Sequence, residues 1–260
     1  MRPMSDVPTL FWNGKGLPNL GDTFELKGRE ARHGIRVLRI KPHSEVRLVD
    51  GRGNILSCKV ADIYKNVLKL ELTKLEEVEP DLCPIYLALS ILKSDKMDLV
   101  VQKGTEIGIE RIYPLYTSRS VVKMDEKKAR HRLARWQEIT RQALKQCKGA
   151  YLTHIQEPVG LSDFLNFSNS LEGAKIVIWE RQHPRHGLYQ AWKQQSRKQP
   201  VTLLVGPEGG FTADESELAF LNGFTPASLG KRILRAETAA IGVSFMFRQL
   251  IDEENRKYGA

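Results

Sequence analysis

Apolar and polar residues alternate in short stretches through the first part of the chain, which is the pattern of half-buried strands. We expect strands at residues 45–50, 55–63 and 67–72. Turn signals separate them at Asp50-Gly51 and Lys65-Asn66. A short helix is expected before them, over residues 29–40. A compact barrel accommodates such short strands better than an open sheet does, so residues 1–75 are predicted to form a β-barrel domain.

An acidic, proline-containing stretch at residues 76–81 is the expected linker, and the pattern of apolar and polar residues changes after it. Continuous apolar runs, typical of parallel strands buried on both faces, predict strands at residues 85–91, 111–116, 175–179, 201–205 and 227–229. Helical periodicity and capping signals, which include a capping box at Thr212-Ala213-Asp214-Glu215, predict helices at residues 94–107, 125–147, 212–221 and 237–251. Strands that alternate with helices predict a mostly parallel α/β domain, placed at residues 84–260.

The strand at residues 201–205 leads directly into Gly-Pro-Glu-Gly-Gly at residues 206–210, here called the Gly-rich turn. Glycines allow backbone conformations and close approaches that a Cβ atom would block. In open α/β sheets, ligands bind where strands end. The turn therefore predicts a ligand pocket, and the alternative is a tight connection without a ligand. A phosphate loop and a dinucleotide fingerprint are both disfavoured, because neither spacing is present.

A second segment, residues 229–238, also links an expected strand to a helix. Arg235 stands where a cation opposes the helix dipole, and an arginine kept at such a place often faces a carboxylate or a phosphate. Arg232 could face outward to nucleic acid. Glu237 and Thr238 also have a purely structural explanation, because a negative charge and a capping hydroxyl both stabilise a helix N-terminus.

The formal net charge is +9, from 40 Lys and Arg against 31 Asp and Glu. Such an excess favours a polyanionic partner, nucleic acid first and an anionic membrane second, although some soluble proteins are merely basic. The helix expected at residues 125–147 carries many basic side chains beside its apolar stripe, so it offers a surface for phosphates.

Several sequence features bear on the cellular compartment of the protein and on metal binding. Three widely separated cysteines predict a reduced, cytoplasmic setting. The histidines have no metal-binding spacing, so we expect no metal site. The first residues lack the apolar run of a signal peptide, and no stretch of about 18 apolar residues predicts a membrane span.

Around the two segments the chain resembles the family of ribosomal RNA small subunit methyltransferase E. These SPOUT-class enzymes methylate N3 of a uridine in 16S rRNA. The resemblance covers nearly the whole chain and is specific at residues 204–210 and 229–239. Supporting matches are His33 with Arg36-Val37-Leu38-Arg39, Asp50-Gly51, Lys96-Met97, residues 102–108, and Trp136 with Gln146-Cys147. The chain departs from the family at residues 7–12, which lack an expected Arg, and at Lys148-Gly149, where Gly-Arg is usual.

The resemblance implies a PUA-like barrel, a C-terminal SPOUT α/β domain with a trefoil knot, a homodimer, and S-adenosylmethionine (SAM) bound in the knot. The implied SAM-binding residues are Ile178, Trp179, Glu180, Val205, Gly206, Pro207, Glu208, Gly209, Gly210, Leu229, Gly230, Ile233, Leu234, Arg235 and Thr238. Contacts with 16S rRNA are expected at Arg36, Arg39, Lys93, Lys96, Arg135 and Lys148.

For such a reaction the protein must align the methyl donor with the acceptor. Uridine N3 must lose its proton, so we expect a cation, Arg232 or Arg235, to stabilise the anion. Glu237 or solvent would accept the proton, and the base must be unpaired or flipped out. Three alternatives stay open: a SPOUT methyltransferase for another RNA or base atom, a non-catalytic ribosome-assembly protein, and an enzyme that binds ATP or GTP.

Overall fold

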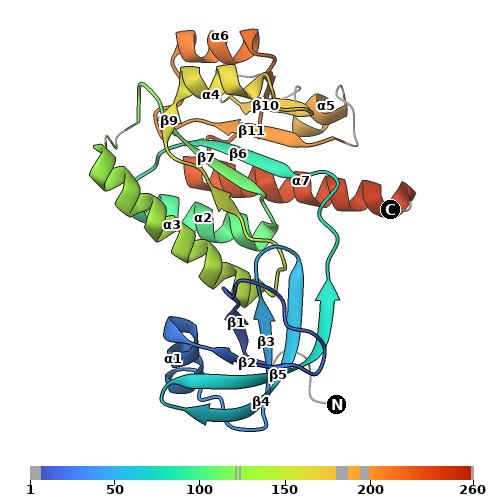
Figure 1. Cartoon of the computed structure of the whole chain (residues 1–260). Coiled ribbons are helices and arrows are strands. Elements are labelled where there is room, and N and C mark those ends of the chain that lie inside the picture. The colour runs from blue at the N-terminus through green and yellow to red at the C-terminus, as the bar shows by residue number, and fades with distance from the viewer. Residues whose placement is uncertain (1–6, 121, 123, 180–186, 194–198, 259–260) are drawn as a thin grey trace. The chain divides into compact units, whose positions relative to one another are not determined.

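The protein is described by a computed structural model that covers residues 7–120, 122, 124–179, 187–193 and 199–258. Two compact units divide the chain. The first contains Met1–Pro80 and Arg141–Leu152, and the second contains Asp81–Thr140 and Thr153–Ala260. Each unit has a β-sheet of its own (Figure 1).

The sheet of the first unit has five strands in the order β1-β3-β4-β5-β2. The strands are β1 (Thr9–Phe11), β2 (Thr23–Leu26), β3 (Glu45–Val49), β4 (Asn54–Tyr64) and β5 (Val67–Glu77). β1 pairs with β3 in parallel, and the other pairs are antiparallel. Register shifts between β4 and β5 allow these long strands to bend. The sheet curls around one apolar core, to which helix α1 (Gly28–Arg36) contributes Ala31.

The three strands predicted for this unit are confirmed, but two boundaries were wrong and two strands were missed. β5 continues to Glu77, so it takes in the first two residues of the expected linker. The helix expected to reach residue 40 ends at Arg36, and Arg39 adopts a left-handed conformation with φ of 52°. β1 and β2 were missed because three and four residues are too few for a recognisable alternation.

Residues 141–152 belong to the first unit although they lie far along the chain. The Lys145 ammonium lies 3.0 Å from both carboxylate oxygens of Glu30 on α1. Glu30 also accepts a hydrogen bond of 2.9 Å from the backbone N–H of Phe11. Leu144 packs with Val49 in a small apolar cluster. Sequence periodicity gave no sign of this long-range association.

The second unit contains a parallel sheet in the order β12-β10-β11-β6-β7-β8, with β9 also paired to β7. Its strands are β6 (Ile85–Ser90), β7 (Arg111–Tyr116), β8 (His154–Ile155), β9 (Val159–Gly160), β10 (Ala174–Ile178), β11 (Val201–Val205) and β12 (Thr225–Ala227). Its helices are α2 (Ser94–Ile107), α3 (Glu126–Cys147, up to Thr140), α4 (Leu161–Ser168), α5 (Leu188–Lys193), α6 (Ala213–Leu221) and α7 (Ala236–Tyr258).

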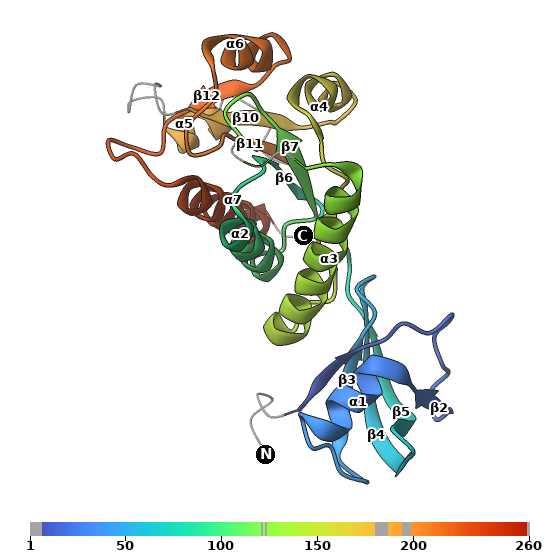
Figure 2. The same ribbon diagram turned by 90° about the vertical axis from the view of Figure 1, so that its left-hand side faces the viewer.

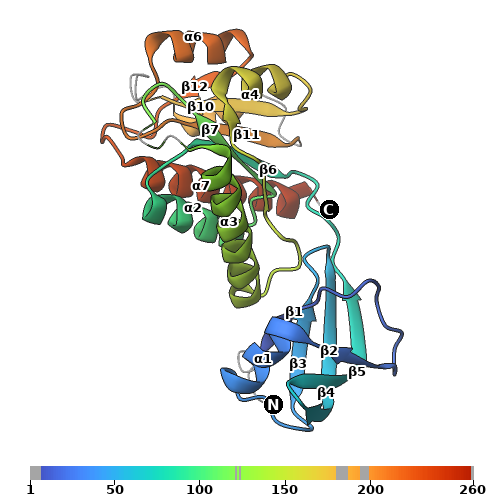
Figure 3. The same cartoon turned by 60° about the vertical axis from the view of Figure 1, so that its left-hand side comes forward.

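Helices cover both faces of this sheet. α2 and α7 pack together on one face, and α4 and α6 lie on the other (Figure 2 and Figure 3). The central strands therefore face apolar clusters on both sides, and β11 is buried at all five positions. This double burial explains why the sequence showed continuous apolar runs there rather than alternation.

The predicted α/β alternation is confirmed, including the capping box at Thr212. Its hydroxyl accepts a hydrogen bond of 3.1 Å from the Glu215 backbone N–H, and the Glu215 carboxylate accepts one of 2.9 Å from the Thr212 N–H. The strand expected at residues 227–229 was wrong, since β12 ends at Ala227 and contains Pro226, which an edge strand tolerates. α7 extends past the expected residue 251 to Tyr258. The short elements β8, β9, α4 and α5 were missed.

Candidate active site

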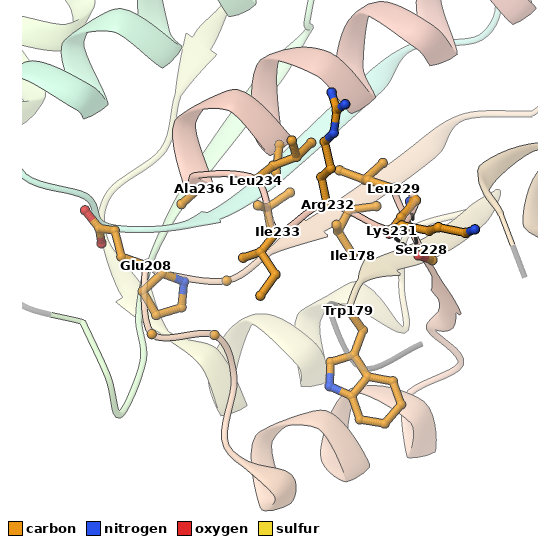
Figure 4. Close-up of a pocket in the computed structure, with 17 residues that line it drawn as sticks. Ile178, Trp179, Glu208, Ser228, Leu229, Lys231, Arg232, Ile233, Leu234 and Ala236 are labelled. Atoms are coloured by element: carbon orange, nitrogen blue, oxygen red, sulfur yellow. Dashed lines mark hydrogen bonds between the residues drawn. The ribbon is translucent and has the colours of Figure 1, made fainter. Parts of the chain in front are cut away.

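A cavity of about 300 Å³ lies where β10, β11 and β12 end. These strands are parallel and in register, with Ile178 opposite both Val205 and Ala227, so their carboxyl ends meet at one edge of the sheet. The cavity is lined by Ile178, Trp179, residues 205–210, residues 228–234, Ala236 and Ala239 (Figure 4). Apolar side chains and backbone groups make up most of this lining, which is typical of small-molecule sites.

The Gly-rich turn is held in a defined conformation. The Gly210 backbone N–H donates a hydrogen bond of 2.9 Å to the Pro207 carbonyl oxygen, and Gly210 has φ of 66°, which favours glycine. The Arg119 guanidinium donates hydrogen bonds to the carbonyl oxygens of Gly209 and Phe211, at 2.8 and 3.3 Å. The turn is therefore tied to the loop that follows β7.

The opposite wall follows β12. Gly230 has φ of 106°, and its N–H donates a hydrogen bond of 3.1 Å to the Ser228 hydroxyl. Ile233 is 89% exposed although it is apolar, and Leu234 is 39% exposed. Exposed apolar side chains that line a cavity offer surface to an apolar part of a ligand.

One ammonium group stands beside two carboxylates at the start of α2. Nζ of Lys96 donates a hydrogen bond of 2.9 Å to Oε1 of Glu208, in the Gly-rich turn. The same nitrogen lies 3.6 Å from Oε2 of Glu237, in the first turn of α7. These three side chains come from three elements that the sequence separates widely.

The hydrogen bond between Lys96 and Glu208 shifts both pKa values. It raises the pKa of the Lys96 ammonium above its ordinary value. Burial opposes ionisation of Glu208, but hydrogen bonds from Lys96 and from its own backbone N–H outweigh burial and lower the pKa of the carboxyl. Both groups therefore stay charged across the neutral pH range.

Most residues predicted to bind the cofactor lie in the cavity lining, and their binding role stays a prediction. Glu180 falls outside the described residues. Arg235 and Thr238 are exposed next to the lining. Among the predicted catalytic residues, Arg232 lines the cavity, and in Figure 4 its guanidinium extends away from Trp179 and Glu208. Glu237 is only 8% exposed, behind the lining.

The predicted RNA contacts divide between the two units. Arg36, Arg39 and Lys148 belong to the first, where Arg36 donates a hydrogen bond to the Asn66 side chain. In the second unit Lys93 is exposed just before α2. The Lys96 ammonium contacts the two carboxylates described above. The Arg135 guanidinium lies 2.7 Å from the Asp98 carboxylate.

Sequence reasoning missed five residues of the site: Ser228, Lys231, Ala236 and Ala239 in the lining, and Arg119 beside it. Ser228 was hidden because the strand was expected to run through it, and Lys231 follows it in the lining. Arg119 lies 90 residues before the Gly209 carbonyl that it contacts, so local pattern gave no signal for it.

The fold and this site define an RNA methyltransferase, a class that comparison with known proteins supports. The family models described as RNA methyltransferase domain and RNA methyltransferase PUA domain match residues 79–246 and 26–73. The chain belongs to the ribosomal RNA small subunit methyltransferase E family, as the sequence resemblance predicted.

Two relatives with that name illustrate the similarity. The Buchnera aphidicola protein is 30% identical, over 82% of each chain. The Synechocystis protein is 33% identical over 78% of this chain and 65% of its own length. A crystal structure of the Neisseria gonorrhoeae enzyme bound to S-adenosyl methionine is 29% identical, with a TM-score of 0.82 over 94% of this chain and 98% of that one.

Two features are absent from the described residues. No helix among them is long and apolar enough to cross a membrane. No group of three or more His, Cys, Asp or Glu residues in the same part of the chain could hold a metal ion.

Replacement of Gly230 by Ala tests the left-handed bend in the second wall. A Cβ atom has open space there, so the expected loss comes from backbone strain alone. We expect the free energy of unfolding to fall by about 1–2 kcal/mol, measured by urea denaturation. Gly16→Ala, at an open position with ordinary φ, is the matched control and should change little. Equal stability of the two variants would contradict the strained bend.

Proposed function

We propose that this protein transfers the methyl group of SAM to N3 of a uridine in the 16S rRNA of the small ribosomal subunit. The observation that carries the proposal is the cavity at the joined ends of β10, β11 and β12. Membership of the methyltransferase family supports the reaction class. The names of the relatives support the ribosomal substrate.

The lining residues fit SAM as their ligand. Ile178, Leu229 and Ile233 offer apolar surface for the adenine ring, and neighbouring backbone groups can hydrogen-bond its edge. The Glu208 carboxylate is also in the lining, where Lys96 donates a hydrogen bond to it. When bound, SAM supplies an electrophilic methyl group on a positively charged sulfur.

The acceptor nitrogen needs a nearby cation, because uridine N3 becomes anionic as its proton leaves. Arg235 is exposed beside the cavity, immediately before α7, and Arg232 lines the cavity. We favour Arg235, because the Arg232 guanidinium extends away from Glu208 (Figure 4).

Solvent is the proton acceptor that we favour. The lowered pKa of Glu208 makes that carboxylate a weak base. Glu237 is buried and its charge is compensated by Lys96, so it is poorly placed to receive a proton from a bound base.

The rest of the proposal concerns the RNA and the assembly. The net charge of +9 favours binding to rRNA, and a flipped uridine would expose N3 to the cavity. A barrel at residues 1–75, a methyltransferase domain at residues 84–260, a trefoil knot, a homodimer and a cytoplasmic location are parts of the same proposal.

The deciding experiment is methylation of small-subunit particles isolated from a strain that lacks the gene. After incubation with the protein and SAM, nucleoside mass spectrometry should detect 3-methyluridine in 16S rRNA. Any other methylated nucleoside would overturn the assignment of the base atom. Calorimetry that finds no SAM binding would instead favour a non-catalytic RNA-binding protein.

Replacement of Arg235 by Ala tests its catalytic role. Loss of a cation that acts on the developing anion should lower kcat about 100-fold to 1000-fold. The dissociation constant for rRNA, measured by filter binding, should rise far less. Arg256→Ala removes the same side chain from the far end of α7 and is the control. Equal losses of methyl transfer and RNA binding in Arg235→Ala would contradict catalysis by this arginine.

A further inference from the structure

The contacts of Lys96 join the Gly-rich turn to the start of α7, and both of these segments line the cavity described above. We propose that Lys96 is a positioning residue, which fixes the Gly-rich turn against the start of α7 and thereby sets the shape of the SAM pocket. This inference rests on the proposed function, because it assigns the pocket to SAM.

The geometry places the ammonium between the walls. Lys96 and Glu208 are 112 residues apart in sequence, and their hydrogen bond connects the first turn of α2 to the Gly-rich turn. The 3.6 Å contact with Glu237 connects the same nitrogen to α7. The side chains of Lys96 and Glu208 are 24% and 27% exposed, and that of Glu237 is 11% exposed. Solvent therefore screens the contact between Lys96 and Glu237 less than it screens a surface pair.

Glu237 depends on Lys96 for its charge balance. Its Oε2 atom is buried and has no hydrogen-bond partner among the described residues. Among the described residues, the Lys96 ammonium lies within ion-pair distance of that oxygen. Without Lys96, this buried oxygen would lose its ion-pair partner and would face a second carboxylate, Glu208. The expected relief is movement of the Gly-rich turn away from α7, because the turn is the more exposed partner.

Movement of the turn would reach the ligand directly. Pro207, Glu208 and Gly209 line one side of the cavity, and Ala236 and Ala239, around Glu237, line another. Arg119 holds the turn at Gly209 and Phe211, so loss of Lys96 would free only the Glu208 side. A widened pocket should therefore bind SAM more weakly while the unit stays folded.

The test compares Lys96→Met with Lys96→Arg and Lys103→Met in the full chain. Lys103, on the same helix, contacts Glu106 at 2.8 Å and stands outside the cavity lining, so it is a matched control. By calorimetry, the dissociation constant for SAM should rise at least about tenfold in Lys96→Met, which is about 1.4 kcal/mol. It should change less than about threefold in Lys103→Met, and it should rise less in Lys96→Arg than in Lys96→Met, because Arg keeps the positive charge.

Hydrogen exchange gives a second readout that needs no cofactor. In the SAM-free protein, amides of residues 206–210 should exchange faster in Lys96→Met than in the other two variants. If the Met variant does not fold, Lys96→Gln replaces it, since Gln is also neutral.

The inference would be overturned by unchanged SAM affinity in the neutral variant, or by an equal loss in Lys96→Arg. Glu208→Gln supplies a further check. Lys96→Met should weaken SAM binding much less in the Glu208→Gln protein than in the wild-type protein, because the two side chains act together. Additive losses of SAM affinity in the double variant would contradict a joint role of Lys96 and Glu208. Failure of the wild-type protein to bind SAM would overturn the proposed function instead, and hydrogen exchange of the turn would still decide the role of Lys96.

Discussion

The parallel register of β12, β10 and β11 is the constraint on which the rest of the site depends. Because Ile178 lies opposite both Val205 and Ala227, three strands end at the same level of the sheet. Backbone groups at these ends have no further strand to pair with, so they are available to turns and to a ligand. Burial of the sheet on both faces holds this register, since a slipped strand would lose its packing against two layers of helices.

Side chains from distant parts of the chain then hold the connections in place. Arg119 fixes the carbonyl side of the Gly-rich turn, and Lys96 fixes its carboxylate side. The capping box at Thr212 starts α6 directly after the turn, so the turn has little freedom at its end. The protein thus supplies a shaped pocket and a few charges, and in the proposed reaction the electrophile belongs to the cofactor.

Sequence reasoning succeeded where short-range physics decides the structure. Continuous apolar runs located β6, β7, β10 and β11, and the Thr-Ala-Asp-Glu pattern located the start of α6. It failed where contacts between distant residues decide the structure. The Lys145 contact with Glu30 helps to place residues 141–152 in the first unit, and no local pattern predicts that contact. Local pattern likewise gave no sign that the Lys96 ammonium, predicted to contact RNA, also contacts two carboxylates from distant segments.

The central claim is that SAM binds at the joined ends of β10, β11 and β12. Hydrogen exchange measured with and without SAM tests it most directly, because protection reports where a ligand orders the backbone. The account predicts slower exchange at residues 205–210 and 228–236, and unchanged exchange in β3, β4 and β5. Protection confined to the first unit, or absent at both cavity segments despite measured SAM binding, would contradict it.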